Sequence, residues 1–119
     1  MKYMLMFCGT EKDRARQERL TAEAYQQEFG KVMQWLQDLG PKLVTSGRFQ
    51  PPATATTVRF SDEGAPAITD GPFIEAKEAI GGFAVVDLPD LDEALKVARA
   101  WPAGGCVEVR PFMEAPPRR

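Results

Sequence analysis

At 119 residues, the chain is long enough to form one domain with its own core and too short for two. Its hydrophobic share of 44% and charged share of 27% are typical of a soluble globular domain and argue against disorder. The net charge of −2 gives no basic excess to neutralise phosphates, so we expect no nucleic-acid partner. The absence of histidine excludes Ser–His and Cys–His nucleophiles and imidazole-based metal sites.

The first forty residues predict a strand and a helix. Residues 3–8 are apolar on both alternating faces, as in a strand that is covered on both sides. Residues 11–20 mix both signs of charge and are expected to form a solvated turn or a short helix. Thr21 fits the N-cap of a longer helix that ends at Gly40. The apolar face predicted for this helix consists of residues spaced by three or four: Tyr25, Phe29, Val32, Leu36 and Leu39.

The middle of the chain predicts a short strand and a hairpin. Residues 43–46 have the pattern of a short strand with one polar face. Residues 54–60 are strand-like and half exposed, and residues 61–64 have the composition of a tight turn. Residues 66–69 are expected to pair back across this turn.

The last third predicts a strand, a helix and a final strand. Residues 83–88 are again apolar on both faces. Asp90 is expected to cap the following helix, with Glu93 completing a capping box. The buried face predicted for this helix consists of Leu91, Ala94, Leu95 and Ala98. Residues 106–111 predict the final strand, and residues 114–119 a flexible tail after a single domain over residues 1–113.

This order of elements predicts an α+β protein with the ferredoxin-like βαββαβ fold and an added hairpin. The two strands that are apolar on both faces are expected at the centre of the sheet. Two helices cover only one face of such a sheet, so the other face needs a cover. We expect a second copy of the same sheet there, which makes a homodimer with a cleft at the edge of its interface.

Several segments together resemble a known family. The string Asp70-Gly71-Pro72-Phe73, followed by Lys77-Glu78 and Gly81-Gly82, is similar to the signature of the DGPF proteins, which belong to the wider YCII-related family. Matching pieces occur near both ends, in Lys2-Tyr3-Met4 and in residues 107–111, so the similarity covers nearly the whole chain.

The resemblance implies a dimeric α+β barrel built on the ferredoxin-like fold, in agreement with the pattern of elements. It implies little about a reaction, because fold likeness alone does not transfer function. A His–Asp pair is suggested as catalytic in some members, and here only the matching carboxylate, Asp70, is present. Related proteins are associated with sigma factors of the extracytoplasmic type, which implies a regulatory setting.

Asp70 has two interpretations. In the structural one, its carboxylate accepts backbone N–H groups, Gly71 permits an unusual φ and Pro72 stiffens the turn, while Phe73 fills the core. In the functional one, the carboxylate lies at the mouth of the dimer cleft, where partial desolvation suits it to act as an acid or a base.

Arg48, Glu75 and Lys77 are the candidates for ligand binding. A cationic side chain that points into a cleft can hold a carboxylate or a phosphate, and Lys77 can alternatively keep Asp70 or Glu75 ionised. A solvated charged hairpin also explains Glu75 and Lys77. We expect ordinary surface pairs for Arg59 and Arg110.

The predicted sheet places its first and last strands side by side, which brings Cys8 close to Cys106. This pair is within reach of a disulfide, or it consists of two small buried side chains in a reducing compartment. Tyr3 and Tyr25, the only phenols, are both expected in the core.

Taken with the mixed charges and the lack of a visible nucleophile–base pair, these features favour a homodimer that binds a small anionic molecule in an accessory or regulatory role. One alternative is an isomerase- or lyase-type enzyme in which Asp70 acts as acid or base. Another is an interaction module that associates with a sigma factor. We expect a cytoplasmic protein without metal, organic cofactor or membrane contact, since no cofactor motif occurs and no apolar run approaches about 20 residues.

Overall fold

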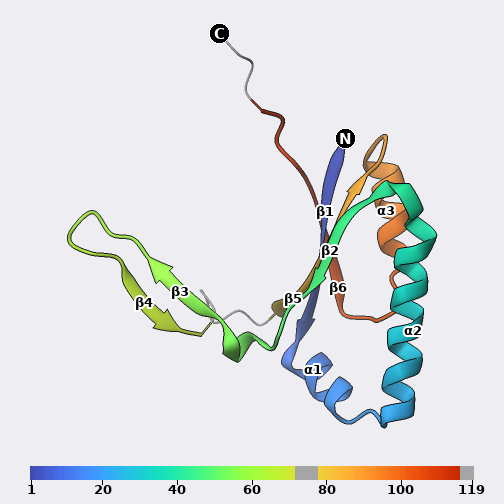
Figure 1. The fold of residues 1–119 in the computed structure, drawn as a ribbon, viewed down its shortest axis with the longest axis horizontal. Coiled ribbons are helices and arrows are strands. Elements are labelled where there is room, and N and C mark those ends of the chain that lie inside the picture. The colour runs from blue at the N-terminus through green and yellow to red at the C-terminus, as the bar shows by residue number, and fades with distance from the viewer. Residues whose placement is uncertain (72–77, 116–119) are drawn as a thin grey trace.

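The computed structural model describes residues 1–71 and 78–115 and has a mixed α+β architecture (Figure 1). Its main element is a four-stranded antiparallel sheet with the strand order β2-β5-β1-β6. These strands are β1 (Lys2–Thr10), β2 (Leu43–Arg48), β5 (Glu78–Asp87) and β6 (Cys106–Pro111). The two strands with apolar residues on both faces, β1 and β5, are central, which confirms that prediction.

Three helices accompany the sheet: α1 (Glu11–Glu18), α2 (Ala22–Leu39) and α3 (Leu91–Arg99). Short 3₁₀ turns follow at η1 (Gly40–Lys42) and η2 (Pro52–Thr54). Figure 1 shows α2 and α3 on the same side of the sheet. The predicted hairpin is present as a separate two-stranded sheet of β3 (Thr56–Arg59) and β4 (Ala67–Asp70), and it projects from the opposite side (Figure 1).

The helices begin at side chains that accept backbone hydrogen bonds, as their sequences predict. The hydroxyl of Thr21 accepts the N–H of Ala24 at 3.1 Å, and the carboxylate of Asp90 accepts the N–H of Glu93 at 2.9 Å. The capping box predicted at Asp90 is wrong, because the Glu93 carboxylate pairs instead with Lys96 at 2.9 Å. A lysine one turn further along the helix offers Glu93 an opposite charge.

A capping box does form at α1, which settles residues 11–18 as a helix. Asp13 accepts the backbone N–H of Thr10 at 2.8 Å, and the Thr10 hydroxyl accepts the N–H of Asp13 at 3.3 Å. The hydrogen bond from the Thr10 backbone lowers the pKa of Asp13. The carboxylate therefore stays ionised at the positive end of the helix dipole.

The core lies between the sheet and the two covering helices. Its fully enclosed centre is Leu5, Ala84 and Val86 on the central strands, with Ala94 of α3 above them. Around this centre an aromatic cluster closes one end: Phe7 stacks on Trp101 with ring centroids 3.8 Å apart. The complete set of buried residues in this cluster is Tyr3, Leu5, Trp35, Leu39, Ala84, Val86, Leu88 and Ala94.

The predicted buried face of α2 is correct only in part, since Leu39 is buried and Leu36 packs against the core. Trp35 and Leu39 are buried, whereas Tyr25 and Phe29 are 37% and 44% exposed, so the expectation of a core Tyr25 is wrong. The cause is Trp35, whose indole N–H donates to the carbonyl of Val97 at 3.1 Å. Its ring also meets the aromatic cluster edge-on, and this large contact sets the rotation of the helix.

In α3 the predicted buried face is correct only in part. Ala94 is fully buried, Leu95 and Ala98 are half-buried, and Leu91 is 48% exposed. Leu91 is the first residue of the helix, four residues after β5 ends at Asp87. At the other end of the chain, residues 116–119 of the predicted tail lie outside the described residues.

Candidate functional site

The face of the sheet that is turned away from α2 and α3 is called here the open face. The alternation of side chains along β1 identifies the residues on it. Tyr3 and Leu5 point into the core, so Met4, Met6 and Cys8 point away from it. Direct strand partners share their face. The partners of these three residues on this face are Val85, Phe83 and Ile80 of β5 and Arg110, Glu108 and Cys106 of β6.

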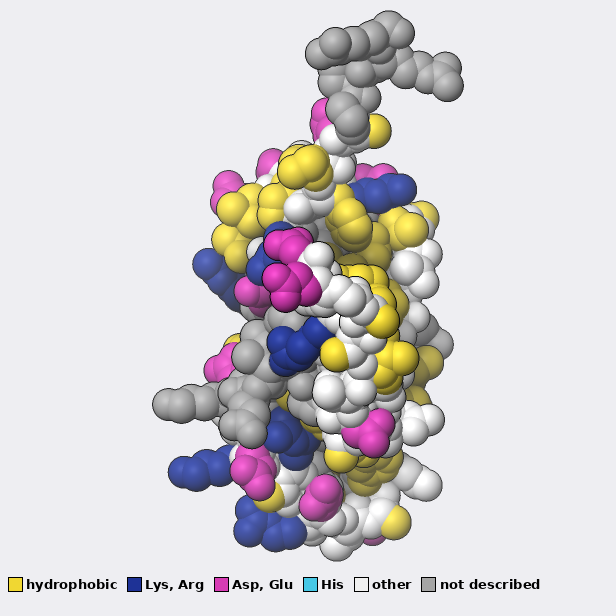
Figure 2. All heavy atoms as spheres, turned by 90° about the vertical axis from the view of Figure 1, so that its left-hand side faces the viewer, with side chains coloured by type: hydrophobic (Ala, Val, Ile, Leu, Met, Phe, Trp, Pro, Cys, Tyr) yellow, Lys and Arg dark blue, Asp and Glu magenta, His cyan; other side chains and the backbone are white. Residues whose placement is uncertain are grey.

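The open face is predominantly apolar at its centre and charged along β6. Val85 is buried, Met4 and Met6 are half-buried, and Ile80 is 46% exposed. On β6, Arg110 and Glu108 form an exposed ion pair at 3.3 Å. Figure 2 shows the molecule from this side, with hydrophobic side chains at the upper end and along the right-hand edge and charged side chains toward the middle and left.

A missing side chain on β2 makes room for an aromatic ring on this face. A Cβ atom at Gly47 would lie 2.7 Å from Cε1 of its strand partner Phe83. The Phe83 ring therefore occupies the space in front of Gly47, and Phe49 lies beside it with ring centroids 5.7 Å apart. Phe49 is 53% exposed, so the rim of the open face is apolar as well.

Arg48, the last residue of β2, lies at the edge of the sheet on the side of α2. Its guanidinium carbon is 5.5 Å from the ring centroid of Tyr25 and 5.9 Å from that of Phe29. The guanidinium also donates a hydrogen bond to the hydroxyl of Tyr25. No carboxylate of the described residues forms an ion pair with Arg48, so two aromatic rings hold a cation whose charge is not neutralised there.

Asp70 ends β4, directly opposite Thr56, and its side chain is exposed. Within the described part of the chain its carboxylate accepts no hydrogen bond. The base of the hairpin is held instead by the backbone of Gly71. Its N–H donates to Ala55 at 2.6 Å, and its carbonyl accepts the Thr57 hydroxyl at 2.8 Å.

Gly71 has a φ of 102°, the left-handed conformation that favours glycine after the Asp of the string. Four of the residues singled out in the sequence, Pro72, Phe73, Glu75 and Lys77, lie outside the described residues.

The two cysteines are directly opposed in the pairing of β1 with β6, as the predicted sheet requires. Both are free thiols. Cys106 donates to the carboxylate of Glu78 at 3.2 Å, and this hydrogen bond raises the pKa of Cys106 to about 12. Burial raises the pKa of Cys8. Because the thiolate is the nucleophile, both groups are weak nucleophiles near neutral pH.

Two shallow hollows lie near α3 and residues 102–105, and Cys106 lines one of them. A hollow of about 460 Å³ lies between the helices α1 and α2 and residues 102–105. Lys31 lines it, together with Arg16 and Glu28, which form an ion pair at 3.0 Å. A second, of about 320 Å³, lies between α3 and β6 and is largely apolar. Sequence patterns missed both, because they depend on how α1 turns back toward α2 and on where α3 lies.

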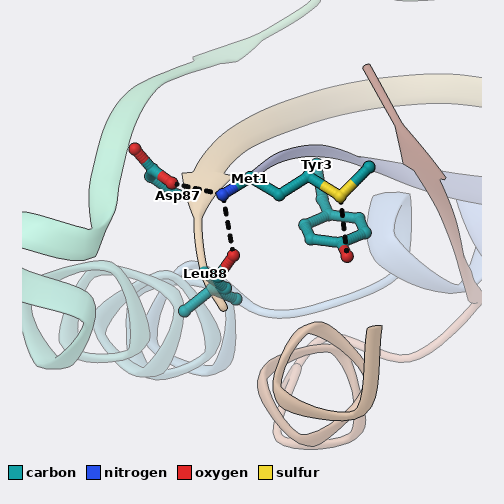
Figure 3. A network of polar contacts seen from close by, with 4 residues as sticks. All are labelled: Met1, Tyr3, Asp87 and Leu88. Atoms are coloured by element: carbon teal, nitrogen blue, oxygen red, sulfur yellow. Dashed lines mark hydrogen bonds and ion pairs between the residues drawn. The ribbon is translucent and has the colours of Figure 1, made fainter. Parts of the chain in front are cut away.

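The chain terminus near the sheet is tied down by a polar network (Figure 3). The α-amino group of Met1 pairs with Asp87 at 3.0 Å and donates to the carbonyl of Leu88 at 3.1 Å. The hydroxyl of Tyr3 donates to the sulfur of Met1 at 3.5 Å. These contacts fix the start of β1 against the end of β5, which is an architectural role.

Two further observations concern the described residues alone. Among residues 1–71 and 78–115, no group of three or more Cys, Asp or Glu side chains is arranged to hold a metal ion. No helix in the same part of the chain is both long enough and apolar enough to span a membrane.

Comparison with known proteins identifies a family and adds no activity. Residues 1–115 match the family model of the YCII-related domain. An uncharacterized protein of Rhizobium meliloti (strain 1021) is 37% identical over 104 residues, which cover 80% of this chain and 84% of that protein. The match of the family model over nearly the full length shows that the chain belongs to the YCII-related family.

Proposed function

We propose that this chain forms a homodimer that binds a small anionic molecule through Arg48, in a cleft near the dimer interface, and serves an accessory or regulatory role. The observation that carries the proposal is the position of Arg48, held between Tyr25 and Phe29 without a carboxylate partner among the described residues. A guanidinium has five N–H donors in a planar fork. Those not bonded to Tyr25 are free to bind a carboxylate or a phosphate.

The aromatic contacts suit this role because they orient the guanidinium without neutralising it. A cation above an aromatic ring gains about 0.5–1 kcal/mol at an exposed site, which is enough to bias its rotamers. A ligand then meets a preorganised donor and a smaller loss of side-chain entropy on binding.

The homodimer is supported by the open face. The strand order β2-β5-β1-β6 with both larger helices on one side is the order of the ferredoxin-like plan, whose bare face needs a cover. Apolar residues in the centre of that face and on its rim make a second copy a suitable cover, because sheets pack through apolar faces about 10 Å apart. Arg48 ends the edge strand β2 and its guanidinium lies on the side of α2, so it stays accessible to a ligand when a second copy covers the open face.

The test measures the binding of small carboxylates and of inorganic phosphate by thermal shift and by calorimetry. These anions should stabilise the wild type saturably. Arg48→Gln should lower the affinity for them at least about tenfold. Arg19→Gln removes the same charge from an exposed position after α1 and should bind like the wild type. Equal binding by Arg48→Gln and the wild type would contradict the assignment of Arg48.

The enzyme alternative is less well supported. Asp70 is exposed, and in the described part of the chain nothing desolvates its carboxylate or positions it by a hydrogen bond. Release of a converted product in the binding series would favour this alternative. A protein that copurifies in place of a small ligand would favour the sigma-factor alternative.

A further inference from the structure

The β3–β4 hairpin has one apolar face that its own chain leaves uncovered. Val58 and Ile68 are direct cross-strand partners, and they are 47% and 69% exposed. Phe60, two residues beyond Val58 and so aligned with the same face, is 81% exposed. The other face carries the polar pair Thr57 and Thr69. The hairpin is therefore amphipathic in the manner of a strand pair that packs against a surface.

Nothing in the described part of the chain provides that surface. Apart from each other, β3 and β4 pack broadly against no described helix or strand. At the base of the hairpin, the backbone N–H of Gly71 donates to the carbonyl of Ala55 and so joins the two ends of the hairpin to each other. An isolated two-stranded hairpin is marginally stable in water, so its order requires contacts from elsewhere.

We propose that this hairpin is an arm that packs, through Val58, Phe60 and Ile68, on a second copy of the same chain. The inference rests on the homodimer proposed above and names a second contact surface within it. The arm projects from the side of the sheet opposite α2 and α3 (Figure 1), which is the side of the open face. A second copy that covers the open face lies next to the arm.

The length of the arm suits this contact. From Thr56 to the turn at Asp62 it spans seven residues, or about 20 Å of extended chain. Two sheets that pack face to face are about 10 Å apart. The arm is thus long enough to pass the edge of a partner's sheet and to lie along its side.

The area needed by a stable dimer also points to a second copy. The four strands have 9, 6, 10 and 6 residues, which gives the open face a flat footprint of about 500 Å² per copy, well below the roughly 800 Å² that each partner buries in a standard interface. Each arm adds a footprint of about 200 Å². In a two-fold dimer every copy both gives and receives an arm, which brings the footprint to about 900 Å² per copy.

The experiment compares three lysine variants by sedimentation equilibrium, with circular dichroism to confirm that each is folded. Ile68→Lys places a charge on the apolar face of the arm and should raise the dimer dissociation constant about tenfold or more. Thr69→Lys places the same charge on the opposite face of the same strand and should leave the constant unchanged. Ile80→Lys alters the open face at a residue that is already exposed and should dissociate the dimer.

The outcomes separate the arm from the dimer. If Ile80→Lys dissociates the dimer and Ile68→Lys does not, the arm proposal is wrong and the homodimer stands. Equal weakening by Ile68→Lys and Thr69→Lys would also overturn the arm, because the effect would not depend on the apolar face. A wild type that is monomeric at every concentration would overturn both proposals.

Discussion

The thiol of Cys106 is a weak nucleophile because of a single neighbour, Glu78. It is exposed, and access alone would leave it reactive. Its hydrogen bond to Glu78 favours the protonated form, and a carboxylate 3.2 Å away repels a thiolate. The pair with Cys8 is therefore close enough for a disulfide and yet poor in the nucleophile that starts its formation.

Replacing Glu78 should release this restraint. In Glu78→Gln the pKa of Cys106 falls from about 12, so the thiolate fraction at pH 8 rises, and alkylation by iodoacetamide should accelerate about tenfold or more. Mass spectrometry of the labelled protein measures the rate for each cysteine. Glu108→Gln removes a carboxylate from the same face that does not bond to Cys106 and serves as the control. An unchanged rate in Glu78→Gln would show that the carboxylate does not set the reactivity.

The same raised pKa has a consequence for stability. A group whose pKa is higher in the folded state than in the unfolded state stabilises the fold below the unfolded value and loses that contribution as the pH rises. For Cys106 the window runs from its ordinary value of 9.0 to about 12. The contribution is thus complete at neutral pH and declines only in alkali.

At the scale of elements, local patterns identified most strands and helix starts. Apolar alternation located β1 and the apolar part of β5, a Gly-containing turn located the hairpin, and Thr21 and Asp90 are the caps they were predicted to be. These features depend on neighbouring residues alone. The antiparallel order of β1 and β6 was enough to bring Cys8 to Cys106.

The rotation of α2 could not be predicted in the same way. Its sequence has an apolar series through Tyr25 and Phe29, and a competing series through Trp35. The choice depends on Phe7 and Trp101, which are distant in sequence and become neighbours only in the folded sheet. The same rotation of α2 leaves Tyr25 and Phe29 exposed and gives Arg48 its aromatic contacts. This part of the candidate site could therefore not be predicted from the sequence either.

A substitution at Trp35 tests which residue anchors α2. Trp35→Phe removes the indole N–H that bonds to Val97 and part of the ring contact, so the free energy of unfolding should fall by about 1–3 kcal/mol. Urea unfolding followed by circular dichroism measures it. Met33→Leu, on the exposed side of the same helix, should change it by less than about 0.5 kcal/mol. Similar losses in both variants would contradict the anchoring role.

At the scale of the whole molecule, the single chain is more extended than its length requires. Its radius of gyration is 17.0 Å, whereas a compact domain of this length has about 13.5 Å. The hairpin that projects from the sheet contributes to this difference (Figure 1). A chain that leaves one sheet face and one arm uncovered gains stability when a second copy covers them.

The thermal midpoint should therefore depend on protein concentration. Because a dimer is favoured by mass action, the midpoint of the wild type should rise by a few degrees for each tenfold increase in concentration. Differential scanning calorimetry over about a hundredfold range measures the trend. Ile80→Lys should show a weaker dependence. A midpoint independent of concentration in the wild type would contradict a folded state that is stabilised by self-association.

The aromatic cluster also determines what an optical experiment can see. The two tryptophans of the chain, Trp35 and Trp101, lie with ring centroids 5.2 Å apart against the same phenylalanine. Intrinsic fluorescence consequently reports on one location, where the helices meet the sheet. Movements of the hairpin leave that emission unchanged, and a Phe60→Trp variant would add a second reporter at the site that the native fluorophores do not sense.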